Sequence, residues 1–192
     1  MNLPNKLTIL RICLVPFVVA VYLCISPEVG ILDEVSGFSI RNLLVLILFA
    51  IASITDYFDG MLARKNNWIT SFGKFADPIA DKLLVNTVLI LLASSQEISV
   101  IPVLLMIARD LVVDGLRMSA AKSGEVVSAG WSGKVKTVLQ MCAILAILLC
   151  NWPFAYWNLP VADLLLWAAT IASLYSGFIY FQKLKKYVLE TM

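Results

Sequence analysis

Histidine is absent from the 192 residues, and charged residues make up only 15% of them. Without an imidazole, the chain has no histidine metal ligand, no histidine-activated nucleophile and no phosphohistidine intermediate. The net charge of +2 is too small a basic surplus to indicate a nucleic-acid-binding protein. The 4 cysteines lie in apolar stretches without a CxxC pair, which favours buried side chains over zinc or redox chemistry.

Apolar residues are abundant instead, at 60% of the chain, with a mean hydropathy of +0.88. A soluble domain carries about 45–50%, and helices of about 20 residues cross a bilayer. We therefore predict an all-α integral membrane protein, a single domain over residues 1–192, with six transmembrane helices and a short N-terminal juxtamembrane segment. The apolar blocks cover residues 12–25 (extended back to residue 7), 42–54, 75–93, 100–121, 138–150 and 161–181.

Lysine and arginine alternate between rich and poor segments along these blocks. Lys6 and Arg11 precede the first block, only Arg41 lies between the first and second, and three lysines follow the last. Segments that face the cytoplasm carry the excess of basic residues in membrane proteins. The pattern predicts a multi-pass protein of the cell membrane with both termini on the cytoplasmic side.

Four aspartates lie where the second and third blocks approach the cytoplasmic boundary. Asp56 and Asp59 are three residues apart, and Asp77 and Asp81 are four apart, so each pair shares one face of a helix. At 1.5 Å per residue, Asp56 lies about 22 Å along its helix from Arg41. The second pair lies roughly 6–12 Å into the next helix, at a similar depth. Because helices joined by a short loop are normally neighbours, we expect the four carboxylates to converge.

Converging carboxylates repel one another in a low dielectric unless a cation compensates them. An all-oxygen ligand set suits Mg²⁺ or Mn²⁺, with two ions expected, rather than zinc or copper. Gly60 and Gly73 would allow a bulky ligand close to the backbone, and Arg64 supplies a cation for a phosphate. This combination indicates phosphoryl-group chemistry. The alternative is that the aspartates cap or solvate helix ends near the lipid headgroups.

The string from Asp56 to Asp81 reads D-x2-D-G-x2-A-R-x8-G-x3-D-x3-D. It resembles the signature of the CDP-alcohol phosphatidyltransferases, integral membrane enzymes of phospholipid synthesis. Residues 4–11, 109–117 and 131–137 are similar to the branch of the family that makes phosphatidylglycerophosphate, so the likeness spans most of the chain. It implies transfer of a phosphatidyl group from CDP-diacylglycerol to sn-glycerol 3-phosphate, with release of CMP.

The resemblance also implies roles for single residues. Asp56, Asp59 and Asp77 would hold the metals, and Asp81 would accept the proton of the attacking hydroxyl and bind the second metal. The CDP-diacylglycerol contacts would be Asn5, Thr8, Asp56, Gly60, Arg64, Thr70 and Gly73. For Asn5 and Thr8 the alternative is simple helix capping after Pro4.

The acceptor's phosphate would be bound by basic residues on the fourth and fifth helices, namely Arg109, Arg117, Lys134 and Lys136. Asp110, Asp114 and Arg117 fall within about 60° of one another on a helix, so this charged stripe should face the bundle interior. The alternative is that one of these aspartates simply pairs with Arg117 while the lysines reach anionic headgroups.

Other functions remain open from the sequence. The acceptor could be inositol phosphate, serine, or phosphatidylglycerol in a cardiolipin synthase. From a different class, a small divalent-cation transporter could use the same aspartates, although transporters bind near the midplane and carry internal repeats. Besides membrane lipids, a homodimer is a possible partner, since Ser173 and Gly177 form a small-residue pair that fits helix packing or a dimer face.

The topology can be tested by labelling single cysteines in a chain without its four native ones. We expect Asn67→Cys and Met192→Cys to react with a membrane-impermeant thiol reagent only from the cytoplasmic side. Labelling of either position from outside alone would contradict the predicted orientation.

Overall fold

The computed structural model describes residues 2–65, 70–122 and 130–189, without the side chains of residues 3–4, 57–60, 62–65, 71, 74, 122 and 186–189. The predicted all-α architecture with six helices is confirmed. A two-stranded antiparallel hairpin between the first two helices and a short 3₁₀ helix before the last are additions that the apolar pattern does not indicate. The elements are α1 (Leu3–Cys24), β1 (Ile31–Asp33), β2 (Phe38–Ser39), α2 (Ile40–Lys65), α3 (Ser71–Ser94), α4 (Val100–Lys122), α5 (Trp131–Leu148), η1 (Phe154–Trp157) and α6 (Val161–Leu189).

Most helices run beyond the apolar blocks. α2 continues past Ile54 through the aspartate signature to Lys65, and α5 begins at Trp131. Backbone N–H and C=O groups in apolar surroundings must form hydrogen bonds within their own helix. The helix therefore continues through the polar residues at the ends of each apolar block. For the same reason the predicted juxtamembrane segment is the beginning of α1, which is continuous from Leu3.

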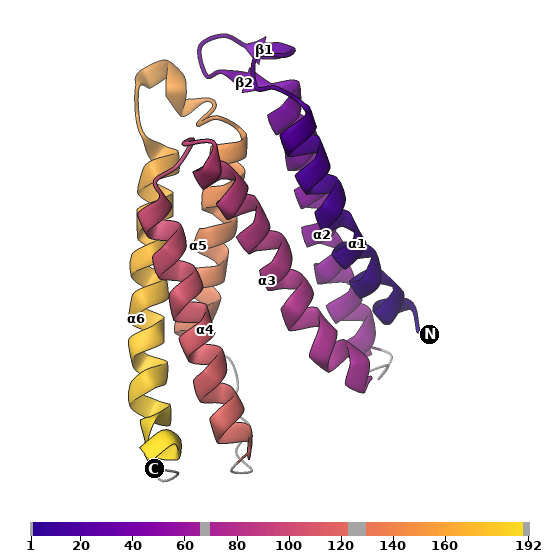
Figure 1. Ribbon diagram of the computed structural model, residues 1–192, viewed down its shortest axis with the longest axis vertical. Helices are drawn as coiled ribbons and strands as arrows, with labels where there is room; N and C mark the ends of the chain where they lie inside the picture. The colour runs from indigo at the N-terminus through magenta and orange to yellow at the C-terminus, as the bar shows by residue number, and fades with distance from the viewer. Residues whose placement is uncertain (1, 66–69, 123–129, 190–192) are drawn as a thin grey trace.

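The helices form two groups of three. In the first, α1 packs against α2 and α3; in the second, α6 packs against α4 and α5. Smaller contacts of α3 with α4 and α5, and of α2 with α5, join the groups. Figure 1 shows that the groups lie close together at the end with the hairpin and η1, and separate toward the end where α1 begins and α6 finishes.

The main apolar core joins the two groups, and its largest fully buried side chains include Phe49, Leu84, Met106, Ile144 and Leu148. Large apolar side chains also cover the outside, as with Phe75, which is 70% exposed. Of the described helices, α1, α5 and α6 contain a segment long and apolar enough to cross a membrane. An apolar exterior of this kind requires lipid around it, and this is a membrane protein.

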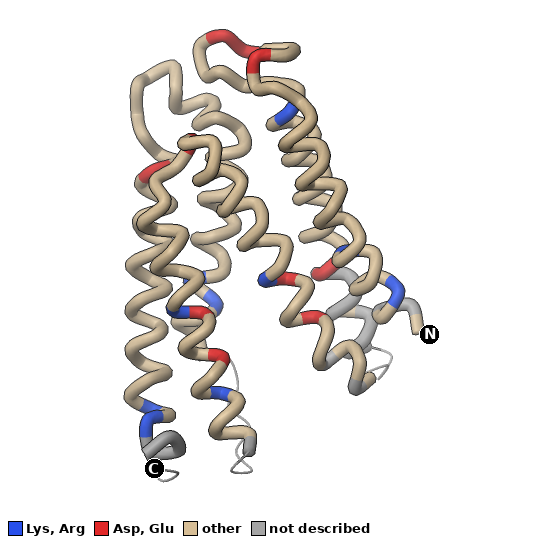
Figure 2. Tube along the Cα trace, viewed as in Figure 1, with Lys and Arg blue, Asp and Glu red and all other residues tan. Residues whose placement is uncertain are grey.

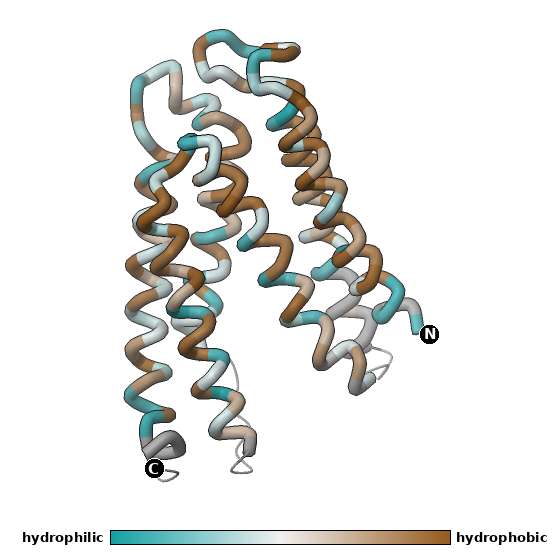
Figure 3. The backbone as a smooth tube through the Cα atoms, viewed as in Figure 1, coloured by the Kyte–Doolittle hydropathy of each residue, from teal (hydrophilic) through white to brown (hydrophobic). Residues whose placement is uncertain are grey.

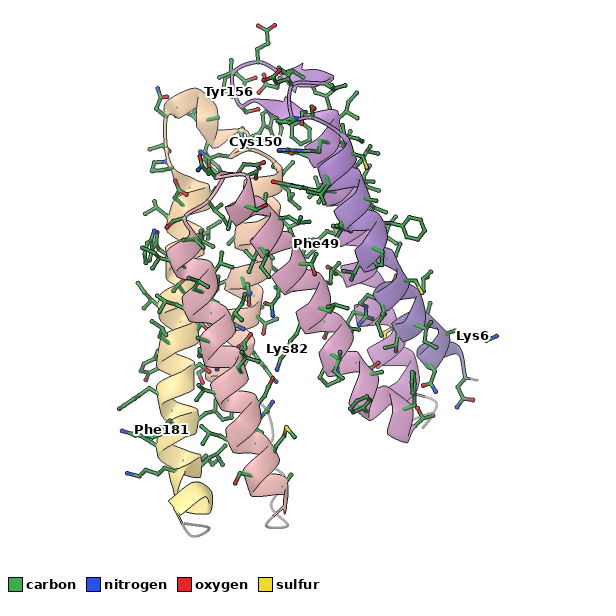
Figure 4. All side chains as sticks on the ribbon, viewed as in Figure 1. Lys6, Phe49, Lys82, Cys150, Tyr156 and Phe181 are labelled. Atoms are coloured by element: carbon green, nitrogen blue, oxygen red, sulfur yellow. The ribbon has the colours of Figure 1, made fainter. Side chains whose placement is uncertain are left out.

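In the described residues, charged positions lie at the hairpin end and again from about the middle of the bundle to the opposite end, with an apolar zone between the two sets (Figures 2 and 3). At the hairpin end, buried Arg41 pairs with Glu97 and lies 4.5 Å over the ring of Tyr22. Tyr156, next to the hairpin end in Figure 4, donates a 2.8 Å hydrogen bond to Asp33. Hydrogen bonds from Ser36 and Tyr156 hold the pKa of Asp33 below its usual value. The contact of Asp33 with Tyr156 fastens the hairpin to η1, and the pair of Arg41 with Glu97 fastens the start of α2 to the loop between α3 and α4.

Candidate active site

Arg11 is the residue around which the aspartates gather at the other end. Its side chain is 0% exposed, and its Nη1 lies 2.8 Å from Asp56 Oδ1 on α2 and 2.7 Å from Asp81 Oδ1 on α3. One guanidinium from α1 thus connects the two signature helices. The structure brings Asp56 and Asp81 together, as the sequence predicts, and adds a cation between them.

The first turns of α1 contribute two more polar side chains to the same place. The hydroxyl of Thr8 donates a 2.6 Å hydrogen bond to Asp77 Oδ1. Thr70 donates one of 2.8 Å to Asn5 Oδ1, and it accepts another of 3.0 Å from the Gly73 backbone N–H, capping α3. Asn5 and Thr8 thus both contact the first two turns of α3 or its N-cap, which the capping alternative alone does not predict.

Gly73 lies at the centre of this polar cluster. A Cβ there would lie 3.3 Å from Thr70 Oγ1, 3.4 Å from Asn5 Oδ1 and 3.5 Å from Asp77 Oδ2. The three described atoms nearest to an added side chain are therefore all oxygens. A glycine at this position keeps the backbone accessible beside them, and the approach of a ligand stays a prediction.

The oxygen-rich cluster suits a hard divalent cation better than zinc. Asp56, Asp77 and Asp81 lie around Arg11 and Thr8, whereas the side chains of Asp59 and Arg64 and the surroundings of Gly60 are outside what the structure describes. Among the described side chains, no group of three or more acidic or cysteine residues is placed to hold a metal ion. The donor chemistry is the kind that the predicted ions require, and the role of Asp59 stays a prediction.

A cavity of about 390 Å³ opens next to the cluster, between the two helix groups. Asp77, Asp81 and Lys82 line it from α3, and basic residues line it from α4 and α5. These facing residues are Arg109, Arg117 and Lys136. The structure therefore places the predicted base and three of the four predicted acceptor-binding cations around one cavity.

Asp110 organises the basic wall. Both of its oxygens accept hydrogen bonds from Lys136, at 2.9 and 2.7 Å, and one accepts a bond of 2.8 Å from Arg109. Arg109 also donates to Ser176 on α6 at 2.8 Å. Arg117 lies 5.2 Å over the ring of Tyr180. The alternative expected Asp110 or Asp114 to pair with Arg117. In the structure, Asp110 pairs with Lys136 and Arg109, and Asp114 pairs with Lys82.

Lys134 is the predicted acceptor residue that the structure does not bring to the site. Its side chain is exposed, and the described residues around the cavity include Lys136 but not Lys134. Two residues apart on a helix are separated by about 200°, so the two lysines face opposite directions. Of these two lysines, Lys134 is the one placed to reach solvent or lipid headgroups.

Three contributors were not predicted as site residues. In the sequence, Arg11 indicates only which side of the membrane the N-terminus faces. Its three-residue spacing from Thr8, and that of Thr8 from Asn5, nevertheless places all three on one face of α1. Lys82 pairs with Asp114 across the two helix groups, and in Figure 4 it projects from α3 toward α4. Gln140 is 4% exposed, lines the cavity and has an amide nitrogen without a partner in the described structure.

The small-residue pair on α6 packs inside the chain. Ser173 is fully buried, and a Cβ on Gly177 would lie 2.8 Å from Arg109 Cγ. Gly177 therefore gives Arg109 the room to lie along α6. Of the two interpretations of this pair, packing within the chain accounts for both residues.

Comparisons with known proteins show the family to which the chain belongs. The protein is 45% identical to the CDP-diacylglycerol--glycerol-3-phosphate 3-phosphatidyltransferase of Bacillus subtilis (strain 168), over 95% of this chain and 94% of that one. Proteins of the same name from Rickettsia bellii (strain RML369-C), at 40% over 97% of both chains, and Haemophilus influenzae (strain ATCC 51907 / DSM 11121 / KW20 / Rd), at 36% over 100% of this chain and 97% of that one, are also similar. The family's sequence model matches residues 1–175, and the chain belongs to the CDP-alcohol phosphatidyltransferase family.

Proposed function

We propose that the protein transfers the phosphatidyl group of CDP-diacylglycerol to sn-glycerol 3-phosphate, giving phosphatidylglycerophosphate and CMP. The observation that carries this proposal is the single cavity bounded by Asp77 and Asp81 on one side and by Arg109, Arg117 and Lys136 on the other. A carboxylate base and a phosphate-binding wall on the same cavity fit an acceptor that carries both a hydroxyl and a phosphate. The matching names of the similar proteins support the same acceptor.

The reaction is a displacement at phosphorus. The acceptor hydroxyl oxygen forms a bond to the phosphorus that carries diacylglycerol, while the bond from that phosphorus to the oxygen of CMP breaks. The leaving electron pair stays on the CMP phosphate, and the hydroxyl proton passes to Asp81. Asp81 is 48% exposed and lines the cavity, so a substrate hydroxyl can reach it. Arg11, bound to its Oδ1, fixes the orientation of the carboxylate.

The basic wall would hold the acceptor phosphate. Arg109 and Lys136 carry two positive charges against the one negative charge of Asp110, and Lys82 and Asp114 neutralise each other, so these described ion pairs leave one positive charge on the wall. The surplus favours a phosphorylated acceptor over serine, whose own charges balance. Gln140 offers an unpartnered amide donor for the acceptor's remaining hydroxyl.

The donor would bind on the α1 side of the cavity. Mg²⁺ or Mn²⁺, as two ions held by Asp56, Asp59, Asp77 and Asp81, would offset the negative charge of the pyrophosphate. The cytidine and phosphate contacts would come from Asn5, Thr8, Asp56, Gly60, Arg64, Thr70 and Gly73. The absence of a side chain at Gly73 leaves room beside Asp77, Asn5 and Thr70 for a phosphate oxygen.

Placement in the membrane follows from the same picture. We propose six spans in the cell membrane, with both termini and the active site toward the cytoplasm. The start of α1 and the end of α6 lie at the same end of the bundle (Figure 1), and this supports an even number of crossings. A homodimer stays a prediction.

Purified protein with CDP-diacylglycerol and a panel of acceptors tests the proposal directly. We expect CMP release to depend on glycerol 3-phosphate, and not on serine, inositol phosphate or phosphatidylglycerol. If no acceptor raised CMP release and the protein instead carried Mn²⁺ into vesicles, the transporter would be favoured.

Removal of the metal or its ligands should stop the reaction. Asp56→Asn, Asp59→Asn and Asp77→Asn each take one negative charge from a shared site, and EDTA should abolish turnover until Mg²⁺ or Mn²⁺ is restored. CMP release measures both effects. Full activity in EDTA would contradict the proposed metal role.

Asp81 and the basic wall should affect different kinetic constants. Asp81→Asn should lower kcat by about 10²–10⁴-fold, the usual contribution of a general base. Lys136→Ala and Arg109→Ala should raise the KM for glycerol 3-phosphate by roughly 10–150-fold, the value of one charge-assisted hydrogen bond, with the donor KM nearly unchanged. Lys134→Ala tests the exposed lysine, and we expect its acceptor KM to match the wild type. Unchanged KM in both Lys136 and Arg109 variants would move the phosphate site elsewhere.

Gly177→Ala should impair acceptor binding through Arg109. The added methyl group would lie 2.8 Å from Arg109 Cγ, so the guanidinium must move from its place beside Asp110 and Ser176. We expect a higher acceptor KM with an unchanged donor KM. Gly115→Ala is the control, since a Cβ at Gly115 meets nothing within 4 Å in the described structure. Equal effects of the two substitutions would refute the steric explanation.

A further inference from the structure

Arg11 has no step of its own in the reaction, yet it is the most deeply placed charge of the site. Its side chain is 0% exposed, and it binds carboxylates from two other helices. A buried guanidinium is costly unless it is paired and hydrogen-bonded. The contacts with Asp56 and Asp81 therefore hold α1, α2 and α3 in one arrangement.

Among the side chains that the structure describes, the charges in contact with Arg11 do not balance. One positive charge lies between the two negative charges of Asp56 and Asp81, and Asp77 accepts a hydrogen bond from the neutral hydroxyl of Thr8 on α1. Carboxylates this close repel one another without a cation. Arg11 offsets part of the repulsion and leaves a negative remainder that attracts further positive charge.

We propose that Arg11 is a resident counter-cation: it compensates the negative charges of Asp56 and Asp81 while no divalent ion is bound. The proposal rests on the metal role proposed above for these aspartates. Arg11 and the divalent ions compensate the negative charge of the same carboxylates. Each should therefore stabilise the folded protein less when the other is present. Loss of Arg11 should thus destabilise the metal-free protein most, and should strengthen ion binding.

Thermal unfolding of Arg11→Gln in detergent, in EDTA and in saturating Mn²⁺, tests the first consequence. We expect a Tm loss on the order of 10 °C in EDTA, the size of breaking a buried ion pair. Mn²⁺ should recover a clear part of that loss. Arg41→Gln is the matched control, because Arg41 is also buried and paired, with Glu97, but at the opposite end of the bundle. Its Tm loss should be the same in both media.

Binding of Mn²⁺, followed by the electron paramagnetic resonance signal of the free ion, tests the second consequence. The Arg11→Gln protein should bind Mn²⁺ roughly tenfold more tightly than the wild type, since a nearby positive charge has been removed. Equal Tm losses with and without Mn²⁺, or weaker Mn²⁺ binding, would overturn the proposal and leave Arg11 a packing residue. Absence of Mn²⁺ binding in the wild type would instead refute the proposed metal role, and the measurements in EDTA alone would then decide the role of Arg11.

A double variant keeps the test decisive if Arg11→Gln does not fold. Adding Asp81→Asn removes one negative charge together with the positive one, so the double variant should be more stable in EDTA than Arg11→Gln. Additive losses of stability, or failure of both variants to fold, would count against charge compensation.

Discussion

A carboxylate that leaves water for the interior of a helical bundle needs a cation or a hydrogen-bond donor, and this need sets how the six helices are arranged. Arg11 meets it for two carboxylates at one end of the first helix group, and Arg41 meets it for Glu97 at the other end. Lys136 and Arg109 do the same for Asp110 in the second group. Apolar packing alone would allow these helices to slide and rotate, whereas ion pairs between helices specify their register.

The division into two groups also separates two chemical tasks. The first group gathers negative charge around Arg11, and the second gathers positive charge around Asp110. The small acceptor carries both a hydroxyl that loses its proton and a phosphate whose charge is neutralised. The two surfaces must therefore face each other across a gap about as wide as that acceptor. The cavity between α3 and the α4–α5 wall provides that separation.

The helices and the convergence of the aspartates could be predicted because both depend on periodicity, which the sequence displays directly. Arg11 could not be assigned from its own position: a basic residue before an apolar block reads as a cytoplasmic anchor, and only the packing of α1 against α2 and α3 shows it buried. The exposed position of Lys134 was available from helical geometry, since Lys136 lies on the opposite face. The role of Gly177 was not, because the contact joins α6 to an arginine 68 positions earlier in the chain.

The tie between Asp33 and Tyr156 joins the loop between α1 and α2 to the loop between α5 and α6, so the two helix groups are stitched together at one end. At the other end, the ion pair of Lys82 with Asp114 is the described charged contact between them. An assembly fastened in this way is tied most closely beside the hairpin. Along a helix of about 20 residues, or ~30 Å, a tilt of about 5° around that end would change the separation of the two groups at the other end by about 2–3 Å.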